Sequence, residues 1–154
     1  MIATKMPTKK INLGFTNEIL QTVCIPVQFV IPKKNVQLAQ HLFKIMQQAN
    51  GIGLAANQVG INQRVFVMLA NNKVYHCFNP EIVQSCPTLI EFDEGCLSFP
   101  NQLCRISRPS RILAKYFSAD GKATVEWLDN LASRCFQHEL DHLNGLTMHD
   151  RVIQ

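Results

Sequence analysis

Apolar side chains recur at steps of three and four residues in two stretches of the chain, and each stretch predicts an amphipathic helix. The first covers residues 35–50 and is closed by Gly51; its apolar positions are Val36, Ala39, Leu42, Phe43, Met46 and Ala49. The second runs from about residue 130 to residue 143, and Gly145 lies just past its end, where helices often terminate on glycine. The pattern therefore predicts one long helix in the first third of the chain and another near its end.

Elsewhere, short runs rich in β-branched and aromatic residues predict strands. They cover residues 64–69, 74–79, 81–83, 105–107, 112–118 and 123–128. Asn71-Asn72 and Asp120-Gly121 are typical of the turns that join neighbouring antiparallel strands. Two helices and such strands predict an α+β fold, with antiparallel or mixed sheets packed around the C-terminal helix.

Composition narrows the picture further. The chain has 154 residues, 47% of them apolar, so we expect a single globular domain over residues 1–154. The net charge is +4 and the basic residues are spread along the chain, which argues against a specific nucleic-acid surface. Residues 1–10 are basic but are not followed by the apolar run of a signal peptide, and no window of about 18 apolar residues predicts a membrane span. We therefore expect a cytoplasmic protein.

Prolines and cysteines add two expectations. Pro7, Pro26 and Pro32 indicate that the first thirty-odd residues are mostly extended or looped. The six cysteines form no C-x-x-C pair, and together with the missing secretory signal they are typical of a reducing compartment, with thiols mostly buried as small hydrophobic groups.

The second predicted helix contains the sequence Gln-His-Glu-Leu-Asp-His at residues 137–142, an H-E-x-x-H motif. Residues four apart lie on the same face of a helix, so His138 and His142 can present two imidazoles to one metal ion. Glu139 is next to the first imidazole and within reach of a metal-bound water. The motif is typical of a site that activates water for hydrolysis.

Such a site needs a third ligand, which could come from either side of the motif. Downstream, the pattern H-E-x-x-H-x-x-G-x-x-H matches through Gly145, but Met148 stands where the third histidine is required. Upstream, Cys96 follows Gly95, and a thiolate with two imidazoles leaves a fourth position open for water. A closed structural site is the other alternative; its fourth ligand would be His41, His76 or His149, and Glu139 would then have no role.

A third segment, residues 51–58, reads Gly-Ile-Gly-Leu-Ala-Ala-Asn-Gln, and residues 94–100 read Glu-Gly-Cys-Leu-Ser-Phe-Pro. With residues 137–145 they resemble the three signature motifs of the peptide deformylases, in the family's order. Residues 20–27 are also similar to the family's N-terminal segment, so the resemblance extends over residues 20–151. It implies an enzyme that hydrolyses the N-formyl group of the initiator formyl-methionine of nascent polypeptides and releases formate. A metalloprotease that cuts internal peptide bonds is the alternative use of H-E-x-x-H.

The resemblance also implies a role for each motif residue. Cys96, His138 and His142 would hold one divalent metal ion, usually Fe²⁺ in the family, although this ligand set also accepts Zn²⁺, Ni²⁺ or Co²⁺. The catalytic groups would be Glu139 as the proton carrier, with Gln58 and the backbone N–H of Leu97 as oxyanion donors. Substrate binding would use the backbone around Ile52, Gly53 and Gly95, and a methionine pocket lined by Ile52, Phe92, Leu131 and Cys135. For these pocket residues, plain core packing is the alternative.

Some positions depart from the family pattern or extend it. Arg134 stands where several members have an aliphatic residue near the pocket rim, and we expect it to bias the residues tolerated after methionine. Leu103 occupies a position where bacterial relatives often have an arginine that holds the peptide backbone. We also expect Glu94 and Arg108 to pair and to brace the loop that carries the thiolate, a solvated surface being the alternative.

The chain stops nine residues after Gly145, whereas many relatives continue into a C-terminal helix or strand. This ending resembles the short forms encoded by viruses of bacteria (bacteriophages), and implies that a ribosome-docking element is missing while the active site is kept. We expect a monomer that acts on formyl-methionine peptides and makes at most a transient contact with the ribosome.

Overall fold

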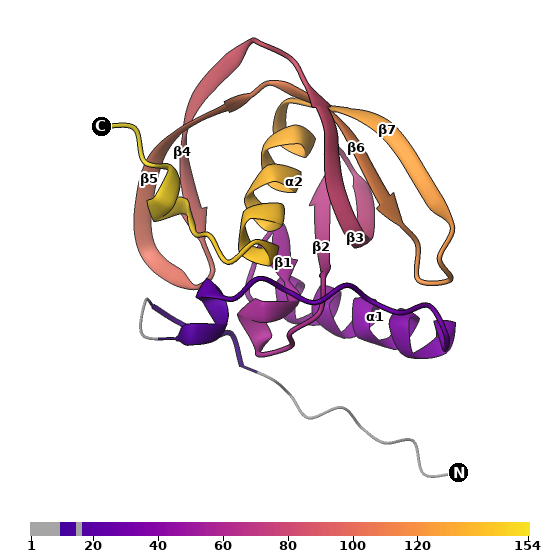
Figure 1. The fold of residues 1–154 in the computed structure, drawn as a ribbon. Coiled ribbons are helices and arrows are strands. Elements are labelled where there is room, and N and C mark those ends of the chain that lie inside the picture. The colour runs from indigo at the N-terminus through magenta and orange to yellow at the C-terminus, as the bar shows by residue number, and fades with distance from the viewer. Residues whose placement is uncertain (1–9, 15–16) are drawn as a thin grey trace.

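The computed structural model describes residues 10–14 and 17–154, and Pro7 lies outside the described residues. These residues contain two α-helices, seven strands and three short 3₁₀ helices (Figure 1). In chain order the elements are η1 (Glu18–Gln21), α1 (Pro32–Gln48), β1 (Gly53–Ala55), η2 (Ala56–Val59), β2 (Val65–Ala70), β3 (Lys73–Ser85), β4 (Leu89–Cys96), β5 (Phe99–Pro109), β6 (Arg111–Phe117), β7 (Ala123–Asp129), α2 (Asn130–Leu143) and η3 (Met148–Arg151).

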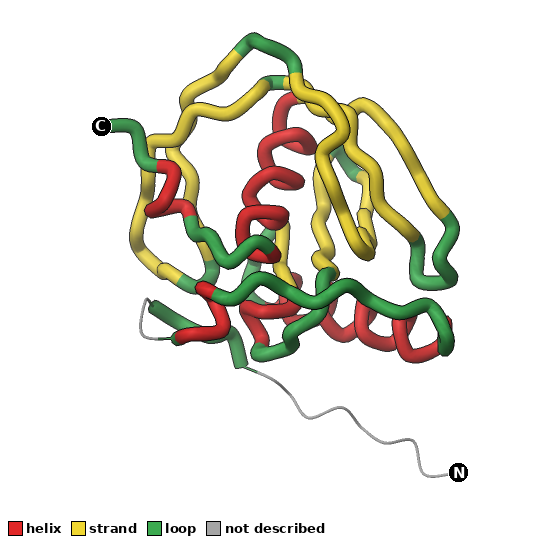
Figure 2. The backbone as a smooth tube through the Cα atoms, viewed as in Figure 1, coloured by secondary structure: helices red, strands yellow, loops and turns green. Residues whose placement is uncertain are grey.

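The strands form two antiparallel sheets on either side of α2. Five strands make one sheet in the order β1-β2-β3-β6-β7, and β4 and β5 make a separate two-stranded ribbon. Figure 2 shows helix α2 in red at the centre, with strand segments around it. The predicted α+β architecture around the C-terminal helix is confirmed, and among the described strands every pairing is antiparallel.

Helix α2 is central because almost every face of it is buried. Phe136 and Leu143 are fully buried, and Phe136 packs edge-on against Phe66 of β2 with ring centroids 5.1 Å apart. The helix ends where Gly145 takes a positive φ of 74°, a conformation that glycine adopts at little cost. The predicted second helix is therefore confirmed with its bounds, and it also carries buried polar side chains that core packing does not require.

Helix α1 packs its apolar stripe on β1 and β2, but it differs from the prediction at both ends. It starts at Pro32 rather than at residue 35, because proline at the first helical position loses no hydrogen bond. Val36 is 41% exposed and lies outside the buried stripe. The first apolar residue of that stripe is Leu38. Ala49 caps the helix and does not continue it.

The hairpin turns were predicted correctly, whereas several strand bounds were not. Asn71 and Asn72 have φ of 52° and 60° between β2 and β3, the left-handed pair that a two-residue hairpin needs. Residues 74–79 and 81–83 belong to one strand, β3, because a bulge after Phe78 lets the pairing with β6 continue.

Strand β5 extends far beyond the predicted 105–107, and strands β1 and β4 were not predicted. Strand β1 has only three residues, all buried, so it shows no alternation. Strands β4 and β5 are stabilised by pairing with each other, and their exposed faces carry charges such as Arg105 beside Glu91 and Asp93.

Residues 17–31 are mostly extended or looped as expected, apart from the 3₁₀ turn η1. Within the described residues, no helix is long and apolar enough to cross a membrane.

Candidate active site

Three candidate metal ligands from distant parts of the chain meet at one point. Cys96 is the last residue of β4, and His138 and His142 lie one turn apart on α2. The donor atoms of the three side chains all lie within 4.8 Å of one another, and Cys96 Sγ is 3.3 Å from His142 Nε2. Among residues 10–14 and 17–154, no other Cys, His, Asp or Glu joins this group.

The donors suit a divalent cation. Burial, followed by the charges of His138 and Arg108, holds the pKa of His142 well below its ordinary value, so its imidazole is neutral, the form that binds metals. Burial would also lower the pKa of His138, but its hydrogen bonds with Cys96 and Glu94 outweigh burial and raise that pKa to about 10. The site therefore favours positive charge beside the thiolate, and thiolate-imidazole sets of this kind bind transition metals.

The other ligands considered from the sequence lie elsewhere. Met148 is buried against the β4-β5 ribbon, so the downstream pattern has no ligand there. His149 contacts Gln102 Oε1 at 2.8 Å, and His76 packs against Phe43. His41 lies on α1, which does not contribute to the group of three donors. The fourth ligand that a closed structural site would need is thus absent from the described part of the chain.

Glu139 lies at the same site, where it lines the pocket beside His138. Its side chain is buried and, among the described residues, its Oε2 atom accepts no hydrogen bond. Burial raises the pKa of this carboxyl from 4.5 to about 7, the charge of His138 acting in the opposite direction. A side chain built on Gly53 would meet Glu139 Cδ at 2.9 Å and Cys135 Sγ at 3.0 Å, so only glycine leaves room for the carboxylate.

Gln58 lies on the other side of the thiolate. Its Oε1 accepts the backbone N–H of Ala55 at 2.9 Å, while its Nε2 donates to Ser98 Oγ at 3.1 Å and faces Cys96 Sγ at 3.6 Å. The amide is fully buried and held at both ends, so its N–H group has a fixed direction. Leu97 lines the same cavity next to Cys96.

The site opens into a pocket of about 370 Å³ between β1, β4 and α2. All six residues predicted to bind substrate line this pocket: Ile52, Gly53, Phe92, Gly95, Leu131 and Cys135. Ile52, Phe92 and Leu131 are 48%, 57% and 44% exposed, which contradicts core packing for these three side chains. Cys135 is buried and closes the inner end, where its Sγ donates to Ile52 O.

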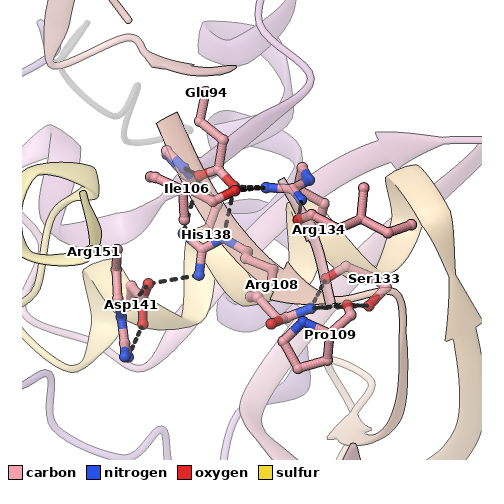
Figure 3. Close-up of polar contacts among 11 residues, drawn as sticks. Glu94, Ile106, Arg108, Pro109, Ser133, Arg134, His138, Asp141 and Arg151 are labelled. Carbon is pink, nitrogen blue, oxygen red and sulfur yellow. Dashed lines mark hydrogen bonds and ion pairs between the residues drawn. The ribbon is translucent and has the colours of Figure 1, made fainter. Parts of the chain in front are cut away.

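A buried network of charges supports the ligands from behind (Figure 3). The carboxylate of Glu94 accepts hydrogen bonds from Arg108 at 2.6 and 3.0 Å, from Arg134 at 2.6 Å and from His138 Nδ1 at 3.0 Å. Burial opposes ionisation, but the bonds from His138 and Arg108 lower the pKa of Glu94 to about 2. The predicted pair of Glu94 and Arg108 is confirmed; it orients His138 as well as the strand that carries Cys96.

Comparison with known proteins gives a consistent result. The family model described as polypeptide deformylase matches residues 10–154. The peptide deformylase of Thermotoga maritima is 44% identical over 113 residues, covering 73% of this chain and 69% of that protein. The chain belongs to the peptide deformylase family. It is therefore a hydrolase that removes the N-formyl group from nascent chains, and no finding favours the protease alternative.

Solved structures of deformylases share the fold. The crystal structure of the Thermotoga maritima peptide deformylase superposes with a TM-score of 0.90 at 38% identity, covering 95% of this chain and 98% of that one. A peptide deformylase from Acinetobacter baumannii with Met-Ala-Ser bound gives a TM-score of 0.87 at 27% identity, covering 94% and 98%. Deformylases depend on a metal, which agrees with the group of three donors found here.

Of the two departures from the deformylase pattern, Arg134 lines the pocket and Leu103 lies beside Gly95 at its rim. Leu103 is 74% exposed, and its side chain lies 3.6 Å from where a Cβ atom on Gly95 would be, so it offers no charge beside the expected peptide backbone. Arg134 lines the pocket, but its guanidinium is directed at Glu94 and at the carbonyls of Ile90 and Ile106.

Three buried polar residues escaped the sequence reasoning. Asp141 accepts hydrogen bonds from Arg108 at 2.9 Å and from Arg151 at 2.9 Å, extending the network to η3. Asn57 donates to the carbonyl of His142 at 2.6 Å, and Ser98 accepts from Gln58. Asp141 and Asn57 stand inside the deformylase motifs. Their position in these motifs was the feature of the sequence that could have indicated a role beside the ligands.

Proposed function

We propose that the pocket between β1, β4 and α2 carries out deformylation with one divalent metal ion held by Cys96, His138 and His142. The observation that carries this proposal is the convergence of the three donor atoms within 4.8 Å, beside the buried carboxyl group of Glu139, whose Oε2 has no hydrogen-bond partner among the described residues. When bound, the metal supplies Lewis-acid chemistry that polarises the reacting groups and makes water more acidic. We also propose that the chain works as a single catalytic domain.

Glu139 is the proton carrier of the reaction. Its side chain lines the pocket, and Gly53 leaves the carboxylate room to approach a substrate. A water molecule loses a proton to Glu139 while the oxygen of that water forms a bond to the formyl carbon. The same carboxyl then gives a proton to the departing amine as the C–N bond breaks, so the products are formate and a free N-terminus. General acid-base catalysis of this kind contributes about 10²–10⁴-fold in rate.

Gln58 and the backbone N–H of Leu97 stabilise the negative charge that develops on the formyl oxygen. The amide of Gln58 is fixed by Ala55 and Ser98 before substrate binds, so it needs no reorganisation during the reaction. Loss of one such donor typically costs about 10²–10³ in rate.

The substrate is a formyl-methionine peptide bound as an added strand. Strand β1 is at one edge of its sheet and, among the described strands, β4 pairs with β5 alone, so Gly53 and Gly95 lie on strands that each keep a free edge. Ile52 precedes β1 and lines the same pocket, and its carbonyl already accepts the backbone N–H of Leu69. The apolar pocket of Ile52, Phe92, Leu131 and Cys135 takes the methionine side chain. The Met-Ala-Ser complex of the Acinetobacter baumannii relative supports this assignment.

We further propose Fe²⁺ as the physiological metal, with Zn²⁺, Ni²⁺ or Co²⁺ as alternatives in purified protein. The expected setting is the cytoplasm of a bacterial or infected bacterial cell, where a monomer meets nascent chains during a transient contact with the ribosome.

The test is formate release from formyl-Met-Ala-Ser by anaerobically iron-loaded protein, with casein as the protease substrate. We expect formate release and no casein cleavage. The variant Glu139→Gln should keep its metal and lose at least about 10²-fold in kcat. Casein cleavage without formate release, or full activity of this variant, would contradict the proposal.

A further inference from the structure

The position of Arg134 on α2 gives it contacts with both strands of the ribbon. Its Nη1 donates to Glu94 Oε1 at 2.6 Å and to the carbonyl of Ile106 at 3.3 Å, while its Nη2 donates to the carbonyl of Ile90. Ile90 and Glu94 belong to β4 and Ile106 to β5. The side chain therefore ties the ribbon to α2, and Figure 3 shows it beside Glu94 and Ile106. Its two contacts on β4, Ile90 and Glu94, stand on either side of Phe92 in the sequence.

Phe92 is held less firmly by its surroundings than a core side chain is. It is 57% exposed, and among the described strands its strand β4 pairs with β5 alone. The guanidinium of Arg134 lies over its ring, 5.6 Å from the centroid, within the range of a cation–π contact. Both side chains line the pocket proposed for methionine, as Ile52 does.

The positive charge of Arg134 is paired with a negative charge inside the protein. Glu94 pairs with it directly, and only 13% of its side chain is exposed. The guanidinium therefore does not offer a free cation that would select acidic peptides. Its contribution lies in the shape it gives the pocket, because a flat, multiply bonded group holds a neighbouring ring in one orientation.

We propose that Arg134 is a positioning residue that sets side-chain selectivity, by holding Phe92 and strand β4 against α2 as one wall of the methionine pocket. This inference rests on the proposed function, since it concerns the same pocket and the same substrate. In the presence of Arg134, the pocket fits an unbranched side chain between Phe92 and Leu131. Without it, Phe92 can rotate into solvent and the pocket widens.

The test compares metal-loaded parent, Arg134→Leu and Arg134→Lys on formyl-Met-Ala-Ser and formyl-Phe-Ala-Ser, with metal content measured in each. For Arg134→Leu we expect a rise of about fivefold in KM for the methionine substrate and a kcat within about twofold of parent. The preference for methionine over phenylalanine in kcat/KM should fall about fivefold or more. Arg134→Lys keeps the charge but not the forked geometry, so its selectivity should resemble that of Arg134→Leu.

Arg105→Leu is the matched control, because Arg105 does not line the pocket and makes exposed ion pairs with Glu91 and Asp93 on the same ribbon. It should keep the selectivity of parent. An unchanged preference in active Arg134→Leu, or a loss confined to kcat or metal content, would overturn the proposal.

Phe92→Ala provides a second route should the Arg134 variants fail to fold, since this exposed side chain contributes little to the core. It should lose the same preference for methionine, and adding Arg134→Leu to it should lower the preference no further. A preserved preference in Phe92→Ala would also overturn the inference. Failure of the proposed function looks different, because parent itself would then release no formate.

Discussion

Arg108 allows a quantitative test of the charge network behind the metal ligands. It is buried on β5 and makes three hydrogen bonds, two to Glu94 and one to Asp141, whose side chains are 5% and 8% exposed. Replacing it with leucine leaves two buried carboxylates with fewer partners. Breaking a buried pair in this way costs about 3–5 kcal/mol. Because Glu94 keeps Arg134 and His138, we expect the lower end, about 3 kcal/mol.

The assay is thermal unfolding of metal-free parent and Arg108→Leu, monitored by circular dichroism. For a chain of this size, about 3 kcal/mol corresponds to a fall in Tm of roughly 6–12 °C. Arg105→Leu is the matched control three positions earlier on the same strand. Arg105 is 53% exposed and its partners Glu91 and Asp93 are equally open, so its loss should cost at most about 1 kcal/mol. Equal effects of the two substitutions would refute the reasoning that burial makes the Arg108 network important.

Three further predictions concern the same site. The pKa of Glu94 is lowered from 4.5 to about 2, so its contribution to the free energy of unfolding is full above pH 4.5 and is lost as the pH falls towards 2. The stability difference between metal-free parent and Glu94→Gln should shrink over that interval; a constant difference would argue against the pairing. Gly53→Ala should displace Glu139 and lower kcat about 10²-fold, whereas Gly95→Ala, whose Cβ has no neighbour closer than 3.6 Å, should keep kcat. Gln58→Leu should lower kcat about 10²–10³-fold with the metal retained, and a smaller effect would exclude the proposed oxyanion contact.

The sequence predicted those parts of the fold whose stability comes from their own residues. Helix α2 has an apolar stripe and a glycine after its last turn, and the Asn71-Asn72 turn has residues that tolerate positive φ. Strand β4 and most of β5 escaped prediction because pairing between the two strands, rather than apolar alternation, stabilises them. Strand β1 escaped because it is buried on both faces and only three residues long.

In the site, too, the sequence predicted what local spacing determines and missed what tertiary contacts determine. Helical spacing alone predicted that His138 and His142 share a face, but it left the third ligand open between a downstream histidine and Cys96. The family motifs pointed to Cys96, and tertiary folding then brought its sulfur to 3.3 Å from His142 Nε2. The roles of Asp141 and Asn57 could not be predicted, because their partners come from η3, β5 and the backbone of α2.

The central claim is that one sulfur and two imidazoles hold a single metal ion and leave room for substrate. X-ray absorption spectroscopy at the metal edge of zinc-loaded protein tests it most directly. The account predicts one sulfur and two imidazole nitrogens around each ion, and loss of the sulfur in Cys96→Ser although five other cysteines stay in place. A metal shell without sulfur in the parent, or with a fourth protein ligand, would contradict the account.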